Sequence, residues 1–114
     1  MSEYRKLRTV AAIGLEEIRL YEHTLEHIRQ EHPEVPILLP MLQSAVESAV
    51  MRPTHVEQSY GNSYVFVDAT STNHSGDPLR VPVKAVTGTS GRVRTAYFAS
   101  TTSARNVVWR RDND

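Results

Sequence analysis

Three of the five histidines of this 114-residue chain lie close together, at His23, His27 and His32. Imidazole is well suited to proton transfer near neutral pH, because its unperturbed pKa is about 6.5. His23 and His27 are four residues apart, so both would lie on the same face of a helix. This stretch therefore predicts either a metal-binding helix or a helix that carries proton-transfer groups.

The segment from His23 to His27 matches the H-x-x-E-H pattern of inverted zinc proteases. A catalytic zinc ion also needs a third protein ligand, usually a carboxylate from another element, and an open fourth position. The next helical segment offers only Glu47 for that role, and the chain is short for a protease cleft. We therefore favour a solvated, charged helix face over a zinc site, and we expect neither a metal ion nor another cofactor.

The clearest strand pattern runs from Leu79 to Ser100, where two β-rich segments flank a turn rich in Gly, Thr and Ser. We predict a β-hairpin here. In a symmetric register Lys84 lies directly opposite Arg94, while Thr95 and Tyr97 point to the other face. Opposed like charges destabilise a strand pair unless solvent or an anion separates them, so this face is a candidate anion site. All four residues share one site only if a bulge shifts one strand.

Helices and strands must position these groups, and the N-terminal part reads as mainly helical. Strand-like alternation at Ile18-Arg19-Leu20 competes there with a helical pattern. The helical pattern is clear from about Tyr21 to Glu31 and ends before Pro33. A second helix begins near Pro40, carries an apolar stripe and ends before Pro53.

The remainder of the chain reads as antiparallel sheet, with further strands expected at His55–Tyr60, Ser63–Ala69 and Asn106–Arg110. The expected α+β domain has two or three N-terminal helices packed on a four- to five-stranded antiparallel sheet. Its parts are an arm or helix start (1–12), a helical part (13–52), the sheet (55–110) and a loose tail (111–114).

Charge is distributed unevenly, although the net charge is zero. Residues 1–57 carry six Lys/Arg and nine Asp/Glu, a balance of −3, whereas residues 58–114 carry seven Lys/Arg and four Asp/Glu, a balance of +3. The predicted sheet is therefore the cationic part. The absence of cysteine fits a reducing compartment, and no apolar run is long enough for a membrane span. We expect a soluble, cytoplasmic protein without a membrane partner.

Several short motifs occur in a characteristic order along the chain. They are HI-x3-HPE from His27 to Glu34, Val56-x-x-Ser59, Tyr64, the Val-x-Val-Lys strand ending at Lys84, and Arg-Val-x-Thr-Ala-Tyr from Arg92 to Tyr97. This order resembles the phage-associated and polymorphic-toxin members of the barnase–EndoU–colicin–RelE superfamily of small ribonucleases. The resemblance covers roughly Ile18 to Phe98. It departs from the family at Glu31, where an arginine often precedes the His-Pro pair.

The resemblance implies helices on an antiparallel sheet and metal-independent cleavage of RNA. The positions that match the family's catalytic residues are His27, His32, Lys84, Thr95 and Tyr97. It also implies a neutralising immunity or antitoxin protein as a partner. Each of these residues has a structural alternative, such as a helix-surface histidine or an edge-strand lysine that blocks aggregation.

Metal-free RNA cleavage requires a base for the 2′-OH proton, an acid for the leaving 5′-oxygen and cations for the phosphorane charge. Histidine suits the first two tasks, and lysine or arginine suits the third. The expected substrate-binding residues are Arg80, Arg92, Arg94, Tyr64 and Ser59. The alternative function is a non-catalytic module of the same fold that binds protein or nucleic acid.

Overall fold

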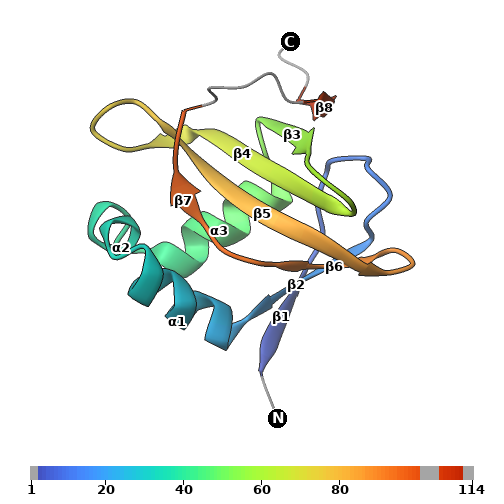
Figure 1. Ribbon diagram of the computed structural model, residues 1–114, viewed down its shortest axis with the longest axis horizontal. Coiled ribbons are helices and arrows are strands. Elements are labelled where there is room, and N and C mark those ends of the chain that lie inside the picture. Colours follow the sequence, from blue (N-terminus) through green and yellow to red (C-terminus); the bar gives the residue numbers. More distant parts are fainter. Residues whose placement is uncertain (1–2, 101–105, 112–114) are drawn as a thin grey trace.

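The computed structural model describes residues 3–100 and 106–111, which form three helices and eight strands (Figure 1). The strands are β1 (Tyr4–Leu7), β2 (Glu17–Tyr21), β3 (His55–Gln58), β4 (Ser63–Thr72), β5 (Pro78–Thr87), β6 (Ser90–Val93), β7 (Tyr97–Phe98) and β8 (Asn106–Arg110). The helices are α1 (Glu22–Glu31), α2 (Glu34–Leu38) and α3 (Leu42–Met51). One sheet contains all these strands in the order β1-β2-β6-β5-β4-β3-β8, with β7 paired to β5.

The sheet is larger than predicted and is mixed rather than antiparallel. Strands β1 and β2 precede the helices and extend the sheet, and β2 runs parallel to β6. Within residues 1–12, expected as an arm or a helix start, Tyr4–Leu7 forms strand β1. The expectation of two or three N-terminal helices on a four- to five-stranded antiparallel sheet is therefore wrong. The reason lies in alternation: Ile18 and Leu20 are buried in the core, while Arg19 between them points away from it.

The helices agree better with the sequence pattern. α1 spans Glu22–Glu31, close to the predicted Tyr21–Glu31, and α3 buries the apolar stripe that includes Val46 and Val50. In Figure 1 α3 crosses behind β4 and β5, so it covers one face of the sheet. The short helix α2 lies between the two helices that the sequence pattern predicts. None of the helices in the described residues is long and apolar enough to cross a membrane.

The strands at the other end of the sheet follow the predicted order. β3 and β4 correspond to the strands expected at His55–Tyr60 and Ser63–Ala69. The tight turn between them contains Gly61 at a φ of +62°. The last strand, Asn106–Arg110, has the predicted bounds and pairs with β3 at the sheet edge. Of the expected loose tail, residues 112–114 lie outside the described residues.

The hairpin register differs from the symmetric one. Lys84 pairs with Arg92 rather than with Arg94, because the strands are joined by a tight turn with Gly88 at a φ of +51° and the register shifts beside it. Farther along, Arg80 pairs with Tyr97. Between these two pairs β5 covers four positions, from Lys84 back to Arg80, whereas the opposite segment covers five positions, from Arg92 to Tyr97. The opposite segment therefore contains one extra residue. This irregularity brings Tyr97 onto the same face as Lys84 and Arg80.

Candidate functional site: the histidine–arginine groove

A groove of about 290 Å³ lies between α1 and the end of β6. It is lined by His23, Thr24, His27, Arg92, Val93 and Arg94. Its origin is the parallel pairing of β2 with β6, because two parallel neighbours run toward the same edge of the sheet. α1 therefore starts beside the segment that follows β6, and the two leave the sheet side by side. We call this cavity the histidine–arginine groove.

The groove combines proton-transfer groups with fixed positive charge. The side chains of His23 and His27 are exposed and come from one helix face, and those of Arg92 and Arg94 are exposed on the opposite wall. Guanidinium groups bind phosphate oxygens through several N–H donors, and imidazoles exchange protons near neutral pH. This set of side chains is suited to an anionic ester such as a phosphodiester.

Aromatic contacts connect the groove to β7. The rings of His27 and His32 meet edge to face with centroids 6.3 Å apart, and the rings of His32 and Tyr97 are 5.9 Å apart. His32 ends α1, where its backbone N–H donates to the carbonyl oxygen of Ile28. His27, His32 and Tyr97, which the family resemblance named together, therefore form one cluster at the helix–sheet junction.

Lys84 occupies a different position from the one expected of it. It lies exposed on β5, directly opposite Arg92, and it does not belong to the side chains that line the groove. The cation that shares the groove with His27 is thus Arg92, and Lys84 lies one strand farther on. Lys84, which the resemblance named with His27, therefore does not line the groove with it.

Thr95 lies in the irregular segment between β6 and β7. Its Oγ1 is buried and has no hydrogen-bond partner among the described residues. A buried polar atom without a partner is unfavourable and needs an explanation. The neighbouring Arg94 stays attached to the sheet, because its backbone N–H donates to the carbonyl oxygen of Pro82 at 2.8 Å. Thr95 is therefore next to a groove residue in sequence, although it does not itself line the groove.

Arg80, expected as an RNA-binding cation on the sheet face, is instead buried. Only 5% of it is exposed, Nη1 donates to Glu57 Oε1 at 2.9 Å, and Nε donates to the carbonyl oxygen of Ala99 at 2.8 Å. His55 Nε2 lies 2.9 Å from the other carboxylate oxygen of Glu57. The expectation of an exposed Arg80 is therefore wrong: it is part of a buried ion cluster of His55, Glu57 and Arg80.

The buried ion cluster keeps Glu57 ionised. Burial acts to raise the pKa of this carboxyl group, but the hydrogen bonds and charges of His55 and Arg80 outweigh burial and hold the pKa below its ordinary value. The sequence patterns did not indicate this cluster. The only signal in the sequence was the alternation of His55 and Glu57 within a predicted strand, and alternation alone places such residues in solvent.

Two other expected substrate-binding residues also lie away from the groove. Tyr64 pairs with Val83 and packs against the core on the helix-covered face. Ser59 belongs to the turn after β3, where its backbone N–H donates to the carbonyl oxygen of Ser63 at 2.8 Å. Val83 and Lys84 are successive residues of β5, so their side chains point to opposite faces of the sheet. Tyr64, the partner of Val83, therefore lies on the opposite face from Lys84.

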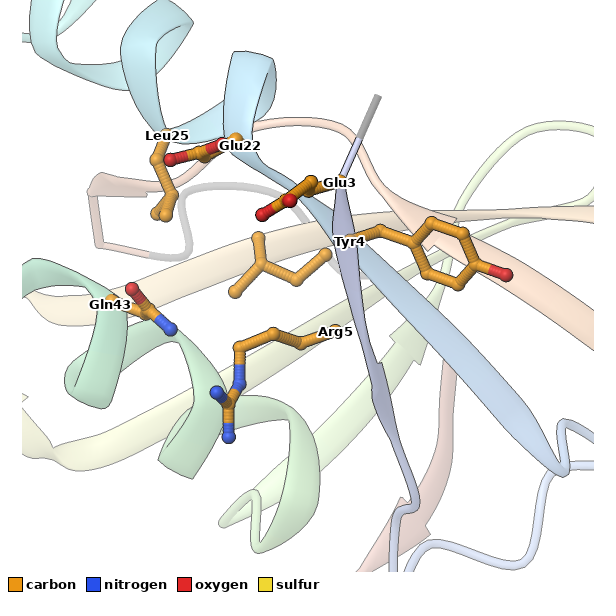
Figure 2. Close-up of a pocket in the computed structure, with 7 residues that line it drawn as sticks. Glu3, Tyr4, Arg5, Glu22, Leu25 and Gln43 are labelled. Carbon is orange, nitrogen blue, oxygen red and sulfur yellow. The ribbon is translucent and has the colours of Figure 1, made fainter. Parts of the chain in front are cut away.

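A second cavity, of about 230 Å³, lies between β1, α1 and α3 (Figure 2). The carboxylates of Glu3 and Glu22 lie on one side of it and Arg5 on the other, while the Tyr4 ring points away. Arg5 forms an ion pair with Glu47, in which Nε of Arg5 lies 2.8 Å from Oε2 of Glu47. Among the described residues that line this cavity there is no histidine, and the one cation is paired. The cavity is therefore less suited to proton transfer on an anion than the histidine–arginine groove.

Neither cavity resembles a metal centre. Within residues 3–100 and 106–111, no group of three or more His, Asp or Glu side chains is arranged to hold a metal ion. Comparisons of this chain with protein-family models, with curated proteins and with solved structures find no match. Function must therefore be inferred from the groove and from the residues around it.

Proposed function

We propose that this protein is a metal-independent endoribonuclease with its active site in the histidine–arginine groove. One observation carries the proposal: His23 and His27 line the same cavity as Arg92 and Arg94. Two imidazoles can act as base and acid in one reaction, and two guanidinium groups can stabilise the charge that develops on phosphorus. The similarity of the motif order to small toxin ribonucleases supports the same assignment.

In this mechanism His27 removes the proton of the ribose 2′-OH, and the 2′-oxygen attacks the adjacent phosphorus. The bond from phosphorus to the 5′-oxygen breaks, and His23, in its protonated form, donates a proton to that oxygen. The products are a 2′,3′-cyclic phosphate and a 5′-hydroxyl. Arg92 and Arg94 bind the non-bridging oxygens, which carry more charge in the transition state than in the substrate.

The test is cleavage of a defined single-stranded RNA by the purified protein in excess chelator. We expect a cyclic phosphate product from RNA and no cleavage of DNA of the same sequence, since DNA lacks the 2′-OH. We expect His27→Ala to lower the rate by about 10²- to 10⁴-fold. His74→Ala, at an exposed histidine in the β4–β5 loop, is the matched control and should leave the rate unchanged. Equal rates for the two variants would disprove the assignment of His27.

The second candidate is a binding module without catalysis, and the position of Lys84 favours it. A residue that the resemblance named as catalytic lies on an exposed strand face outside the groove. Binding of RNA with no cleavage under any metal-free condition would establish this second function. An active enzyme would act on cytoplasmic RNA and would need an inhibitor protein in its producing cell, so toxicity on expression also separates the two.

A further inference from the structure

Four cations form a continuous row on the face of the sheet that α3 does not cover. The register places Lys6 beside Arg19, Arg19 beside Arg92, and Arg92 beside Lys84. The row thus crosses β1, β2, β6 and β5, which are adjacent in the sheet (Figure 1). We call these four residues the cation row.

The cation row places like charges side by side, which disfavours the folded state. Lys6, Lys84 and Arg92 are exposed, so the opposed charges face solvent. Glu17 offsets part of this repulsion, since its Oε2 lies 2.6 Å from Nε of Arg19. The row still has an excess of positive charge, and a polyanion lying across the four strands would relieve the repulsion at every pair.

Aromatic rings lie beside the cation row and lead to the groove. The rings of Tyr4 and Tyr21 are 5.0 Å apart, and the ring of Tyr21 stacks on that of His23 with centroids 5.2 Å apart. The guanidinium carbon of Arg19 lies 4.9 Å from the centroid of the Tyr4 ring. A basic surface with aromatic platforms is typical of proteins that bind single-stranded nucleic acid.

Arg92 joins the cation row to the histidine–arginine groove. It lines that groove and also a smaller cavity of about 110 Å³, whose walls include Arg19 and Tyr21. A ligand bound in the groove would therefore contact the row at Arg92, and a longer ligand would extend from there along the row to Arg19. Because strands are about 4.8 Å apart, the row spans about 14 Å, which is enough for several phosphates of one strand.

We propose that the cation row extends the substrate site beyond Arg92, so that Lys6, Arg19 and Lys84 bind nucleotides flanking the cleaved phosphodiester and the substrate is a single-stranded RNA of several nucleotides. This inference rests on the proposed function. It predicts that a dinucleotide occupies only the groove, while a longer strand also contacts Lys6 and Arg19. Lys6 and Arg19, which do not line the groove, then determine the preference for longer RNA.

Binding is measured by fluorescence anisotropy with a labelled 12-nucleotide, fully 2′-O-methylated RNA, which cannot be cleaved through the 2′-OH. The test variant is Lys6→Ala/Arg19→Ala. Its matched control is Arg29→Ala/Arg52→Ala, which removes two exposed arginines outside the row. We expect the test variant to bind about tenfold more weakly. Its slope of log K against log salt should become shallower by about 1.4, since each phosphate that is no longer neutralised accounts for about 0.7. The control should keep the wild-type affinity and slope.

A second measurement uses cleavage. With a dinucleotide substrate the test variant should match the wild type in kcat/KM, whereas with the 12-nucleotide RNA its kcat/KM should fall about tenfold. An equal decrease in the test and control variants would overturn the inference, because only total charge would then matter. Equally tight binding of polyglutamate would also overturn it. If the protein cleaves no RNA but its RNA binding is weakened by Lys6→Ala/Arg19→Ala, the cation row is supported as a binding surface and the proposed nuclease activity is disproved.

Discussion

Two arginines on the same face of the sheet have opposite environments. Arg80 is buried, with Glu57 as its charged partner and the carbonyl oxygen of Ala99 as a further acceptor. Arg92 is exposed, lies opposite Lys84 and lines two cavities. The residue type is the same, so the position in the sheet decides whether the cation is part of the core or lies at the surface.

The buried arginine depends on its partner because a desolvated charge is costly unless it is paired. Within the described residues, Nη2 of Arg80 is buried without a hydrogen-bond partner, so the ion cluster does not satisfy every donor. The exposed arginine is solvated, and its removal leaves no buried charge behind. The two positions should therefore respond very differently to the same substitution.

The largest expected change in stability is caused by Arg80→Ala, which leaves the carboxylate of Glu57 buried next to His55 without the guanidinium group that pairs with it. We expect the free energy of unfolding to fall by about 3–5 kcal/mol, the range for one-sided removal of a buried ion pair. The measurement is urea denaturation followed by circular dichroism. Arg92→Ala is the comparison, and its change should stay within about 0.5 kcal/mol, as is usual for surface positions. A similar decrease for both would contradict the distinction.

The pH dependence of stability sharpens the same contrast. The pKa of Glu57 is lower in the folded protein than in the unfolded chain, so ionised Glu57 stabilises the fold at pH values above its unfolded pKa. This contribution should disappear as the pH falls from about 4.5 through the lowered folded pKa. Urea titrations of the wild type and of Glu57→Gln should therefore give a stability difference that narrows with acidification. A constant difference down to about pH 2 would show that the Glu57 charge contributes nothing.

The smallest expected effect concerns the exposed pair of Lys84 and Arg92. Lys84→Glu replaces repulsion with attraction between residues directly opposite on neighbouring strands. We expect a gain of about 0.2–1 kcal/mol in the free energy of unfolding, together with weaker RNA binding. The gain should vanish when Arg92 is also changed to alanine. If Lys84→Glu stabilised both backgrounds equally, the two side chains would not be interacting.

Local patterns predicted those parts of the fold that depend on nearby residues. The helix after Tyr21 follows from apolar spacing and from the stop at Pro33, and the final strand at Asn106–Arg110 follows from a short apolar run. The order of motifs named five residues, of which His27, His32 and Tyr97 are joined by ring contacts. The other two, Lys84 and Thr95, do not line the groove. The buried state of Arg80 was missed, because no local pattern shows what covers a strand.

The sequence by itself determined the composition of the groove: two histidines one helical turn apart and a strand segment rich in arginine. Tertiary structure decided which cation meets which histidine. The parallel pairing of β2 with β6 joins segments about 70 residues apart. The extra residue between Arg92 and Tyr97 places the Tyr97 side chain on the opposite face from the one that regular alternation would give. Both depend on pairing between distant strands, whose energy comes from hydrogen bonds and packing that no short window of sequence contains.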